Sequence, residues 1–554
     1  MKSPDESVHC LLVQPQFPEG SFWNYKLACE ALGAKTPMVP LGLLTVAALL
    51  PQFWKFRLVD RNCDDLRDED WAWADIVALG GMLPQQRDLL QVLVAAKQRG
   101  KFVVVGGPDP TSQPDVYSDA DARVLDEGES SIPLWLESWR RGQPRGIFRG
   151  LEKPDMTLSP PPRYDLLTIE NYNQLAIQIS RGCPFNCEFC DIIELYGRKP
   201  RIKTPDQVVR ELEGIRRTGY AGPIDIVDDN FIGNKRVIRT QILPALLRWN
   251  RAHLRPFYFT TQASLNLGDD IPLMRDMRMA GFRFVFFGIE TPETELLLKT
   301  QKSQNVARPM TQRIRQILEQ GLTPVAGFII GFDGEKAGMD TRLIRCIEDH
   351  DLTISMVGML VALPNTQLWR RLQREGRLIG FDGYLKTSHD TVHVDARTSV
   401  FEINDQTVTG LNFVTTRDRH EVLNEFRNIV SSVYQPEAYL RRAYRQAIHG
   451  RLWPIHIPRL WELKRDLRGL GVLMKTMLAD PNLRWIFLKY LIKLIFRGPN
   501  ALDIYLRLAG MFPHFALQRD YVLQKTMDLK VAFSRKSFGL GRQDADAPKG
   551  PRRA

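Results

Sequence analysis

Short apolar runs alternate with longer amphipathic stretches over the first 150 residues. The apolar runs HCLLVQP, FRLVDRN, DIVALGG, FVVVGGP and ARVLDEGE lead into glycine, proline or polar residues, and helix-like stretches such as LGLLTVAALL and QQRDLLQVLVAAKQRG lie between them. Short apolar strands that alternate with helices predict a doubly wound parallel sheet. We therefore expect residues 1–150 to form a Rossmann-like α/β domain.

A similar alternation returns after a proline-rich stretch. KPDMTLSPPPRYD cannot continue a helix or a central strand, so residues 151–170 are predicted to be a linker. Beyond it, the runs LAIQIS, IDIVDD, FYFTTQAS, FRFVFFGIE, TPVAGFIIGF and ISMVGMLVALP alternate with helical segments. Six such units predict a partial (β/α)6 or complete parallel barrel over residues 171–400, followed by a helical, basic domain over residues 401–554.

Composition places the chain among intracellular proteins of several domains. With 554 residues and 44% hydrophobic residues, it is long and apolar enough for two or three cores. Its seven cysteines form one close cluster, which argues against the disulfide framework of a secreted protein. The start, MKSPDESVHCLLVQP, lacks the features of a signal peptide, and no run approaches the roughly 20 apolar residues of a spanning helix. We expect a cytoplasmic location.

Positive charge is concentrated at the C-terminal end. Residues 441–554 hold 23 Lys and Arg against 8 Asp and Glu, a net charge of +15, whereas the remainder holds 52 against 56, or −4. Such an excess indicates an anionic partner surface, either membrane or nucleic acid. Nucleic acid is not expected, because no RNA-binding motif accompanies the charge.

One segment of this region, RWIFLKYLIKLIFRGP, places Lys489, Lys493 and Arg497 at every fourth position. This spacing puts the three side chains on one ridge of a helix. Two interpretations remain open. The segment is a core helix whose lysines extend to water, or it lies on an anionic membrane surface, which the tryptophans Trp453, Trp461 and Trp485 favour.

Candidate binding residues follow the strands of the first domain. In doubly wound sheets, ligands bind beyond the carboxyl ends of the strands. No G-x-G-x-x-G motif follows the first strand, which disfavours a dinucleotide site. The candidates are Gln14, Pro15, Asp60, Asn62, Gly81, Met82, Gly106 and Gly107.

Three cysteines in SRGCPFNCEFC, Cys183, Cys187 and Cys190, follow the first predicted barrel strand. Thiolates are soft ligands that suit iron–sulfur clusters and zinc. A structural zinc site usually has four ligands in two pairs, and the chain has no second C-x-x-C pair. A cluster held by three thiolates keeps one iron open for another ligand. Zinc and purely structural cysteines are the alternatives.

The stretch CPFNCEFC resembles the C-x-x-x-C-x-x-C loop of the radical S-adenosylmethionine (SAM) superfamily. The resemblance implies that Cys183, Cys187 and Cys190 bind a [4Fe-4S] cluster whose open iron chelates SAM, with Phe189 near the adenine. IVDDN looks like the segment that accepts hydrogen bonds from the methionine ammonium, and later strand ends match further SAM contacts. The implied SAM-binding residues are Asp228, Asp229, Asn230, Gln262, Ser264, Glu290, Gly327 and Gly331.

A doubly wound domain ahead of such a barrel resembles the cobalamin-binding subclass of this superfamily. The small signatures VPLGLLTVAALLP, LVDRN, VVVGGP and DEGE are also present. The resemblance implies that cobalamin contacts the strand-end residues named above, together with Glu127, Gly128 and Glu129. Where many cobalamin proteins carry a cobalt-ligating histidine, this chain reads DRNCDD, so we expect cobalamin to bind without a protein nitrogen ligand, with Cys63 as an alternative ligand.

The whole layout is similar to a group of cobalamin-dependent radical SAM enzymes that contains hopanoid C-2 methylases and archaeal lipid ring-forming enzymes. The resemblance implies a C-methyltransferase. A reducing partner such as flavodoxin or ferredoxin reduces the cluster, SAM yields a 5′-deoxyadenosyl radical that activates an unactivated carbon, and methylcobalamin delivers the methyl group. A small molecule or a lipid is the expected substrate, with residues 441–554 in peripheral contact with the inner face of the membrane.

Several alternatives to this function stay open. The nearest is another cobalamin-dependent radical reaction, such as ring formation or the oxidative cyclisation of tetrapyrrole synthesis. A methylase of peptides, other natural products or RNA is a second alternative. A non-enzymatic iron–sulfur or cobalamin sensor belongs to a different class, because it binds the cofactors without cleaving SAM.

Overall fold

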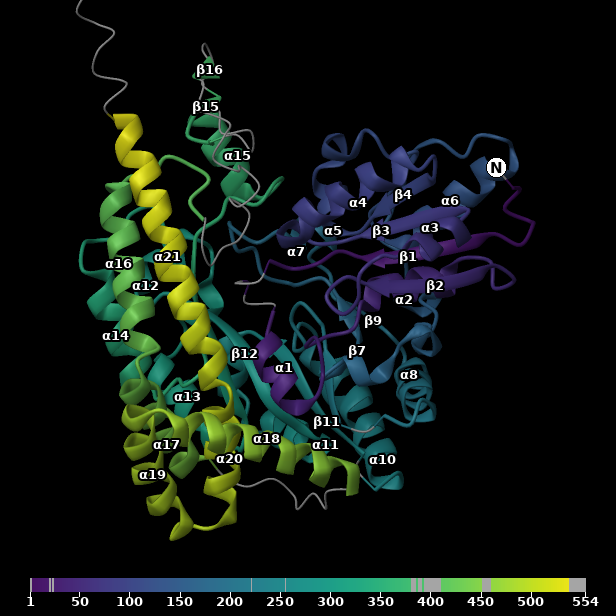
Figure 1. Cartoon of the computed structure of the whole chain (residues 1–554). Coiled ribbons are helices and arrows are strands. Elements are labelled where there is room, and N and C mark those ends of the chain that lie inside the picture. Colours follow the sequence, from purple (N-terminus) through teal and green to yellow (C-terminus); the bar gives the residue numbers. More distant parts are fainter. Residues whose placement is uncertain are drawn as a thin grey trace, which may run out of the picture.

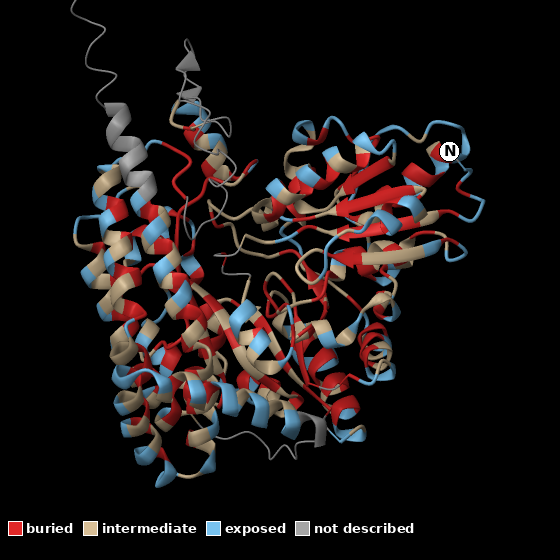
Figure 2. Cartoon of the chain, viewed as in Figure 1, coloured by how far each residue is buried: buried red, intermediate tan, exposed pale blue. Residues whose placement is uncertain are grey.

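The computed structural model describes residues 2–18, 21, 24–220, 222–254, 256–379, 385–386, 391–392, 410–450 and 460–537. Two sheets of six parallel strands each lie side by side, and long helices of the C-terminal region pack against the second sheet (Figure 1). The buried residues follow the strands of both sheets and the inner faces of the helices (Figure 2). The predicted α/β class, with a doubly wound sheet, a partial barrel and a helical C-terminal region, is confirmed.

The first sheet has the strand order β2-β1-β3-β4-β5-β6. Its helices cover both faces: α2 (Leu41–Leu49) and α6 (Gly128–Arg140) pack on one, α3 (Asp68–Trp73) and α4 (Gln86–Gln98) on the other. The strand order reverses between β1 and β3, and sheets of this kind bind ligands at that point. The strands are β1 (His9–Gln14), β2 (Lys55–Asp60), β3 (Ile76–Gly80), β4 (Phe102–Gly106), β5 (Ala122–Leu125) and β6 (Gly146–Arg149).

The second sheet is a partial barrel with the sequential order β14-β13-β12-β11-β10-β7. Helices such as α8 (Pro205–Arg217) follow the strands; the side chain of Thr204 caps α8 by accepting a hydrogen bond from the Gln207 amide, and Pro205 occupies its first turn. The strands are β7 (Leu175–Ile177), β10 (Gly222–Ile226), β11 (Phe257–Ala263), β12 (Phe282–Glu290), β13 (Thr323–Ile330) and β14 (Ser355–Met359). The other helices are α10 (Leu243–Ala252), α11 (Ile271–Ala280), α12 (Thr294–Lys299), α13 (Met310–Glu319) and α14 (Met339–Asp349).

Helix α17 (Pro436–His449), in the C-terminal region, lies at the amino end of this barrel. Gln446, on α17, donates a hydrogen bond to the Pro324 carbonyl (3.4 Å) and accepts one from the Thr353 amide (3.4 Å). This helix therefore lies where β13 and β14 begin. None of the helices in the described ranges has the length and apolar composition to cross a bilayer. The helices that follow β14 in the described residues are α15 (Gln367–Arg374), α16 (Arg419–Val433), α17 (Pro436–His449), α18 (Leu460–Ala479), α19 (Pro481–Ile495), α20 (Pro499–Gly510) and α21 (Phe512–Ser537).

The exact domain limits stay predictions. The boundary expected at residues 400 and 401 lies outside the described residues, as does Trp453. Strand β6 was not predicted from the sequence, because its four residues, GIFR, are mostly exposed and form no apolar run. Helix α1 (Lys26–Leu32) was also not predicted.

Helix α1 joins the first domain to the C-terminal helices. The ring of Tyr25, at its start, lies 4.7 Å from that of His514 on α21, and the Tyr25 hydroxyl donates a hydrogen bond to Met356 Sδ on β14 (3.7 Å). Farther along, the amides of Lys35 and Thr36 donate to the Asn171 carbonyl (2.8 and 3.0 Å). The three parts of the chain are therefore held together by contacts between residues far apart in sequence.

His514 is a buried histidine that makes folding stability depend on pH. It is 5% exposed, its Nε2 has no hydrogen-bond partner among the described residues, and burial lowers its pKa from 6.5 to about 4. Since the unfolded chain binds the proton more tightly, stability is fully present above pH 6.5 and falls as the pH drops towards 4. We expect the loss to reach about 2 kcal/mol near pH 5.

This expectation can be checked by calorimetry. The His514→Phe protein should lose less melting temperature between pH 7 and pH 5 than the unmodified chain, because phenylalanine does not titrate. His350→Gln serves as the matched control, since the His350 ring lies near the surface and forms a hydrogen bond with the Thr311 hydroxyl. An equal loss of melting temperature in the His514→Phe protein and in the unmodified chain contradicts the assignment.

Candidate active site

The cysteine loop lies between two short antiparallel strands, β8 (Ser180–Arg181), which ends two residues before Cys183, and β9 (Arg201–Ile202). Gly182 has a φ of 93°, and a side chain there would lie 2.8 Å from the Gly197 carbonyl. This position therefore requires glycine. The Cys183 amide donates to the same Gly197 carbonyl (3.2 Å), and the Cys190 amide donates to the Cys187 carbonyl (3.2 Å). These bonds shape the loop before any metal binds.

Burial affects the acidity of the thiols in this loop. Cys187 is buried, and burial raises the pKa of the Cys183 and Cys190 thiols, with the charge of Cys187 acting in the same direction. Among the residues that the structure describes, no three Cys, His, Asp or Glu side chains converge closely enough to hold one ion.

Two amide side chains donate hydrogen bonds to the cysteine sulfurs. Gln304 Nε2 lies 3.5 Å from Cys187 Sγ, and Asn230 Nδ2 lies 3.8 Å from Cys183 Sγ. Such bonds from the surrounding protein tune an iron–sulfur cluster. The Oε1 atom of Gln304 is buried without a partner in the described part of the chain. It offers a bound group an acceptor, which fits a ligand beside the cluster.

The predicted residues at the ends of β10 and β11 meet beside Cys183. The Asp229 carboxylate accepts the Gly182 amide (2.9 Å), and burial raises its pKa to about 7. Asn230 bonds to Ser264, whose amide donates to Asn230 Oδ1 (3.1 Å). Asp228 points the other way, because its two oxygens accept the Ile179 amide and the Ser180 hydroxyl (both 2.7 Å), and burial raises its pKa to about 6.

A second group of predicted residues lies on the other side of the loop. Glu290 has a φ of 68° at the end of β12 and forms a buried ion pair with Lys302. The Lys302 ammonium lies 5.6 Å from the centre of the Phe189 ring, which in turn lies 5.7 Å from that of Phe332. An unusual backbone conformation at a buried carboxylate is typical of functional sites. Lys302, which the sequence did not single out, brings positive charge to the cysteine loop.

The remaining predicted SAM residues lie along the same strands. A side chain at Gly327 would lie 2.6 Å from the Phe286 ring, so glycine is required there by packing. The Gly331 amide donates to both oxygens of Glu335 (2.9 and 3.0 Å), and burial raises the pKa of that carboxyl to about 7. Gln262 lies at the end of β11, where its carbonyl accepts the Phe231 amide (2.9 Å). Their contacts with SAM stay predictions.

The cobalamin candidates gather at the carboxyl edge of the first sheet, around the point between β1 and β3 where the strand order reverses. The Pro15 carbonyl, after β1, accepts bonds from Gln85 (2.5 Å) and Asn62 (3.2 Å). Gly107, after β4, has a φ of 94° and lies against Gly81. The side chain of Met82 is partly exposed at this edge, and Gln14 and Gly106 end β1 and β4. Contact of these residues with cobalamin stays a prediction.

Asn62 does not reach out from this edge. Its amide nitrogen donates to the Pro15 carbonyl (3.2 Å) and to Asp60 (2.8 Å), and its oxygen accepts the Phe17 amide (2.9 Å). Asn62 therefore holds the loop after β1 in place. The buried Asp60 also accepts the hydroxyl of Tyr172, from the start of the barrel domain (3.2 Å). Burial raises the pKa of the nearby Cys63 thiol, which disfavours the thiolate that a cobalt ligand requires.

Glu127 and Glu129 of the DEGE segment bind two arginines of the barrel. Arg181 donates to Glu127 (2.7 Å) and to both oxygens of Glu129 (each 2.9 Å), while Arg201 donates to both oxygens of Glu127 (2.7 and 3.0 Å). Burial opposes ionisation of Glu129, but the bonds and charge of Arg181 lower its pKa to about 2. We call these four residues the interdomain ion-pair network. It places β5 and Gly128, at the start of α6, beside the cysteine loop.

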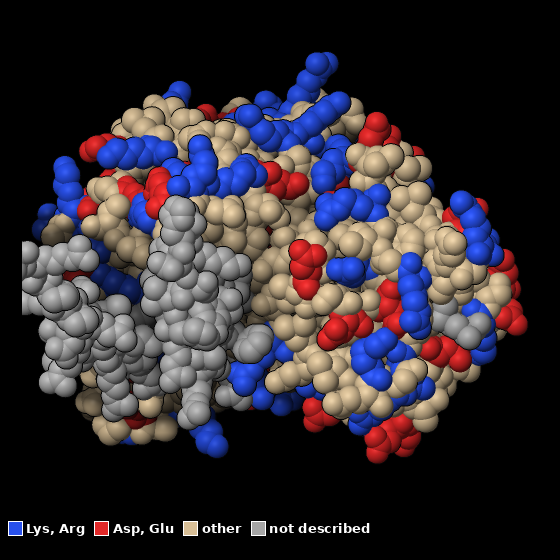
Figure 3. All heavy atoms as spheres, turned by 90° about the horizontal axis from the view of Figure 1, so that it is seen from above, with Lys and Arg blue, Asp and Glu red and all other residues tan. Residues whose placement is uncertain are grey.

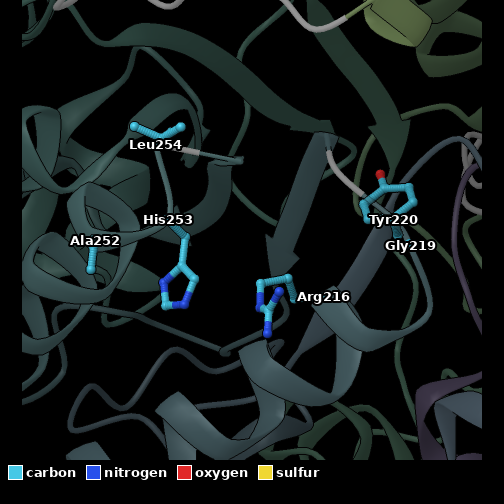
Figure 4. A pocket seen from close by; sticks show the side chains of 6 residues that line it. All are labelled: Arg216, Gly219, Tyr220, Ala252, His253 and Leu254. Carbon is cyan, nitrogen blue, oxygen red and sulfur yellow. The ribbon is translucent and has the colours of Figure 1, made fainter.

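A separate hollow lies at the opposite end of the barrel. Its volume is about 240 Å³, and Arg216 and His253 line it together with Tyr220 and Leu254 (Figure 4). Tyr220 and Leu254 precede β10 and β11, so the hollow faces away from the cysteine loop. It contains none of the predicted site residues.

Two family models match the chain. The model of the radical SAM superfamily matches residues 177–347, and a model described as a domain of unknown function, DUF4070, matches residues 366–527. The uncharacterized methyltransferase sll1242 of Synechocystis sp. is 40% identical over 522 residues, which cover 94% of this chain and 93% of that protein. The hopanoid C-2 methylase of Rhodopseudomonas palustris is 33% identical over 461 residues, 82% of each chain.

Solved structures share the fold. The cobalamin-dependent S-adenosylmethionine radical enzyme OxsB, with aqua-cobalamin bound, has a TM-score of 0.57 at 16% identity, over 96% of this chain and 82% of that one. The radical S-adenosylmethionine methyltransferase TsrM from Kitasatospora setae, with cobalamin and a [4Fe-4S] cluster bound, has a TM-score of 0.58 at 15% identity, over 84% and 99%.

The interdomain ion-pair network should control how the first two domains stay together. Glu127→Ala leaves Arg181 and Arg201 buried with fewer anionic partners, and breaking a buried pair in this way costs about 3–5 kcal/mol. We expect limited proteolysis to cut the 151–170 segment faster and the melting temperature to fall. Glu137→Ala is the control, because Glu137 pairs with Arg141 at the surface. Equal proteolysis of both variants contradicts the proposed role.

Gln304 should set the reduction potential of the cluster. The Gln304→Leu protein lacks the hydrogen bond to Cys187, which stabilises the more negative reduced state. A bond worth about 1 kcal/mol corresponds to a midpoint about 40 mV more negative for one electron, measured by redox titration with electron paramagnetic resonance. Gln367→Leu is the control, since Gln367 bonds to Asn186 and Gln301. An unchanged midpoint in Gln304→Leu contradicts the assignment.

The site and the comparisons point to the same group of enzymes. The three-cysteine loop lies within the matched radical SAM region, beside a doubly wound domain of the kind found in cobalamin enzymes. The hopanoid C-2 methylase and the Synechocystis methyltransferase match 82% and 94% of this chain, at 33% and 40% identity. The chain belongs to the cobalamin-dependent methyltransferases of the radical SAM superfamily.

Proposed function

We propose that this methyltransferase adds a methyl group to an unactivated carbon of a lipid of the hopanoid class. The observation that carries the proposal is the extent of the match to the hopanoid C-2 methylase, 461 residues at 33% identity. The first domain and the barrel, up to the start of α15, contain fewer than 367 residues, so the match extends into the C-terminal helices. The match is therefore wider than the two domains that would hold the cofactors, which supports a shared substrate class as well as shared cofactors.

The roles of the chain's own residues follow from the contacts described above. When bound, the cluster and SAM supply a radical, and cobalamin supplies the methyl group. Cys183, Cys187 and Cys190 would hold the cluster. Asp229 lies beside Cys183, and the positive charge of the SAM ammonium would favour the ionised form of its buried carboxyl group. The interdomain ion-pair network holds the carboxyl edges of the first domain and the barrel against each other, which would bring the reacting groups into one space.

Substrate entry and electron supply complete the proposal. We infer that the substrate enters between the first domain and the barrel, because both carboxyl edges meet there. An electron donor such as flavodoxin or ferredoxin supplies the reducing electron. No contact surface for it is assigned.

The test is an anaerobic assay of the full chain reconstituted with iron, sulfide and cobalamin. With SAM, a reductant and a hopanoid, we expect a hopanoid that carries one additional methyl group from labelled SAM. S-adenosylhomocysteine and 5′-deoxyadenosine should form in equal amounts, because each methylation consumes two SAM molecules. The Cys187→Ala protein should lose its bound cluster and form neither compound.

Other results identify the alternatives. Formation of 5′-deoxyadenosine without S-adenosylhomocysteine indicates ring formation or cyclisation and overturns methyl transfer. Methylation of a tetrapyrrole or a peptide, with none of the hopanoid, overturns the substrate class. Cofactor binding without SAM cleavage under all conditions leaves a sensor as the explanation.

A further inference from the structure

Helix α19 carries large apolar side chains on the face that points away from the protein. Trp485 is 73% exposed, Phe496 at the end of the helix is 86% exposed, and Ile492 is 54% exposed. At 3.6 residues per turn, these three side chains lie within about 40° of one another around the helix axis. Together with Lys489 and Lys493 they form what we call the α19 outer face. An exposed group of this kind marks an interaction site more often than an isolated exposed leucine does.

The opposite face of α19 already supplies the packing that the fold requires. Leu483, Phe487, Tyr490 and Leu494 are buried, and the rings of Phe487 and Tyr505 stack at 5.8 Å. A core helix with extended lysines accounts for these residues. It does not account for Trp485 and Phe496, which gain nothing from the core.

Basic side chains outnumber acidic ones around the outer face. Residues 481–502 include Arg484, Lys489, Lys493 and Arg497 and no acidic residue. Glu437, on α17, pairs with Lys489 (3.3 Å). The Lys493 ammonium lies 5.9 Å from the centre of the Tyr444 ring. Aromatic and aliphatic side chains flanked by basic ones are the combination that binds an anionic bilayer surface.

The location of α19 separates this surface from the reaction site. Helix α17, on which α19 packs, lies at the amino ends of β13 and β14, whereas the cysteine loop lies at the carboxyl end of the barrel. In Figure 1, α19 lies at the bottom of the molecule and the first domain at the top. The view from above shows basic and acidic side chains interspersed over the first domain (Figure 3). On that side, the first domain therefore has no basic surface comparable to the one around α19.

We propose that the α19 outer face is a docking surface for an anionic phospholipid bilayer. Trp485, Ile492 and Phe496 enter the interface between headgroups and acyl chains, while Lys489, Lys493 and Arg497 contact the lipid phosphates. The helix lies flat on the bilayer, because its buried face remains in the protein core. This inference does not depend on which substrate is methylated.

The test is sedimentation of the full reconstituted chain with vesicles of phosphatidylcholine, with and without phosphatidylglycerol. We expect binding to the vesicles that contain phosphatidylglycerol, and weaker binding as the salt concentration rises. Lys493→Gln with Arg497→Gln should weaken binding about fivefold for each charge removed. Trp485→Ser with Phe496→Ser should weaken it at least about tenfold, because the apolar contact is lost.

A matched double variant in the first domain separates this face from a general effect of surface changes. Phe53 is 53% exposed and Arg141 is also at the surface, so Phe53→Ser with Arg141→Gln should bind vesicles like the unmodified chain. The melting temperature of each variant shows whether it is folded. Failure of the unmodified chain to bind the anionic vesicles overturns the proposal, as does equal binding by the α19 variants and the control.

Two further readouts distinguish other occupants and the proposed function. If the α19 variants change the sedimentation-equilibrium mass without changing vesicle binding, the face binds a second copy of the chain, and the membrane proposal is wrong. If the unmodified chain methylates no hopanoid but still binds vesicles through α19, the proposed substrate fails and the docking surface stands. If the α19 variants methylate a detergent-solubilised hopanoid at the normal rate, docking and chemistry are separate, as proposed.

Discussion

The arrangement of the site depends on the buried charges that join the first domain to the barrel. Arg181 precedes the cysteine loop by two residues, and its guanidinium is held by Glu127 and Glu129 at the carboxyl edge of the first sheet. Taking these charges out of water is costly, and the cost is offset only while every partner is present. The domains therefore have one strongly preferred relative position. That position places the cobalamin candidates and the cluster candidates on facing edges.

Contacts within each half reinforce this placement. Asp229 binds the Gly182 amide and Asn230 reaches Cys183, so the end of β10 supports the first cysteine directly. On the other side, the Leu368 amide donates to the Glu188 carbonyl (2.9 Å), and Arg371 on the same helix, α15, bonds to the Glu188 carboxylate (2.6 Å). The region matched by the domain of unknown function thus contacts the cluster loop itself, and does not serve only as a distant addition.

Both sheets could be predicted from the sequence because parallel strands buried on both faces are nearly continuous apolar runs. The cysteine loop was recognisable because its ligands lie within eight consecutive residues. The network around it was not, because the contacts join distant positions: Arg181 and Glu127 are 54 residues apart, and Gln304 and Cys187 are 117 apart. The residues around Gln304 do not reveal its role, because Gln304 meets Cys187 only in the folded barrel. The acidic DEGE segment shows the related difficulty that a short motif reveals its residue types but not their partners.

The positions of α19 and of the cysteine loop limit how a lipid could be used. If the bilayer contacts α19, the carboxyl edges of both sheets face away from it, with the barrel in between. A membrane-embedded substrate would then have to leave the bilayer before it reaches the cofactors. Docking would increase the time that the protein spends near the lipid without delivering the substrate directly. Recognition of the extracted lipid would fall to residues between the domains, where burial and exclusion of water also serve the radical chemistry. Anchoring and chemistry therefore place separate demands on the chain, and the fold meets them at opposite ends.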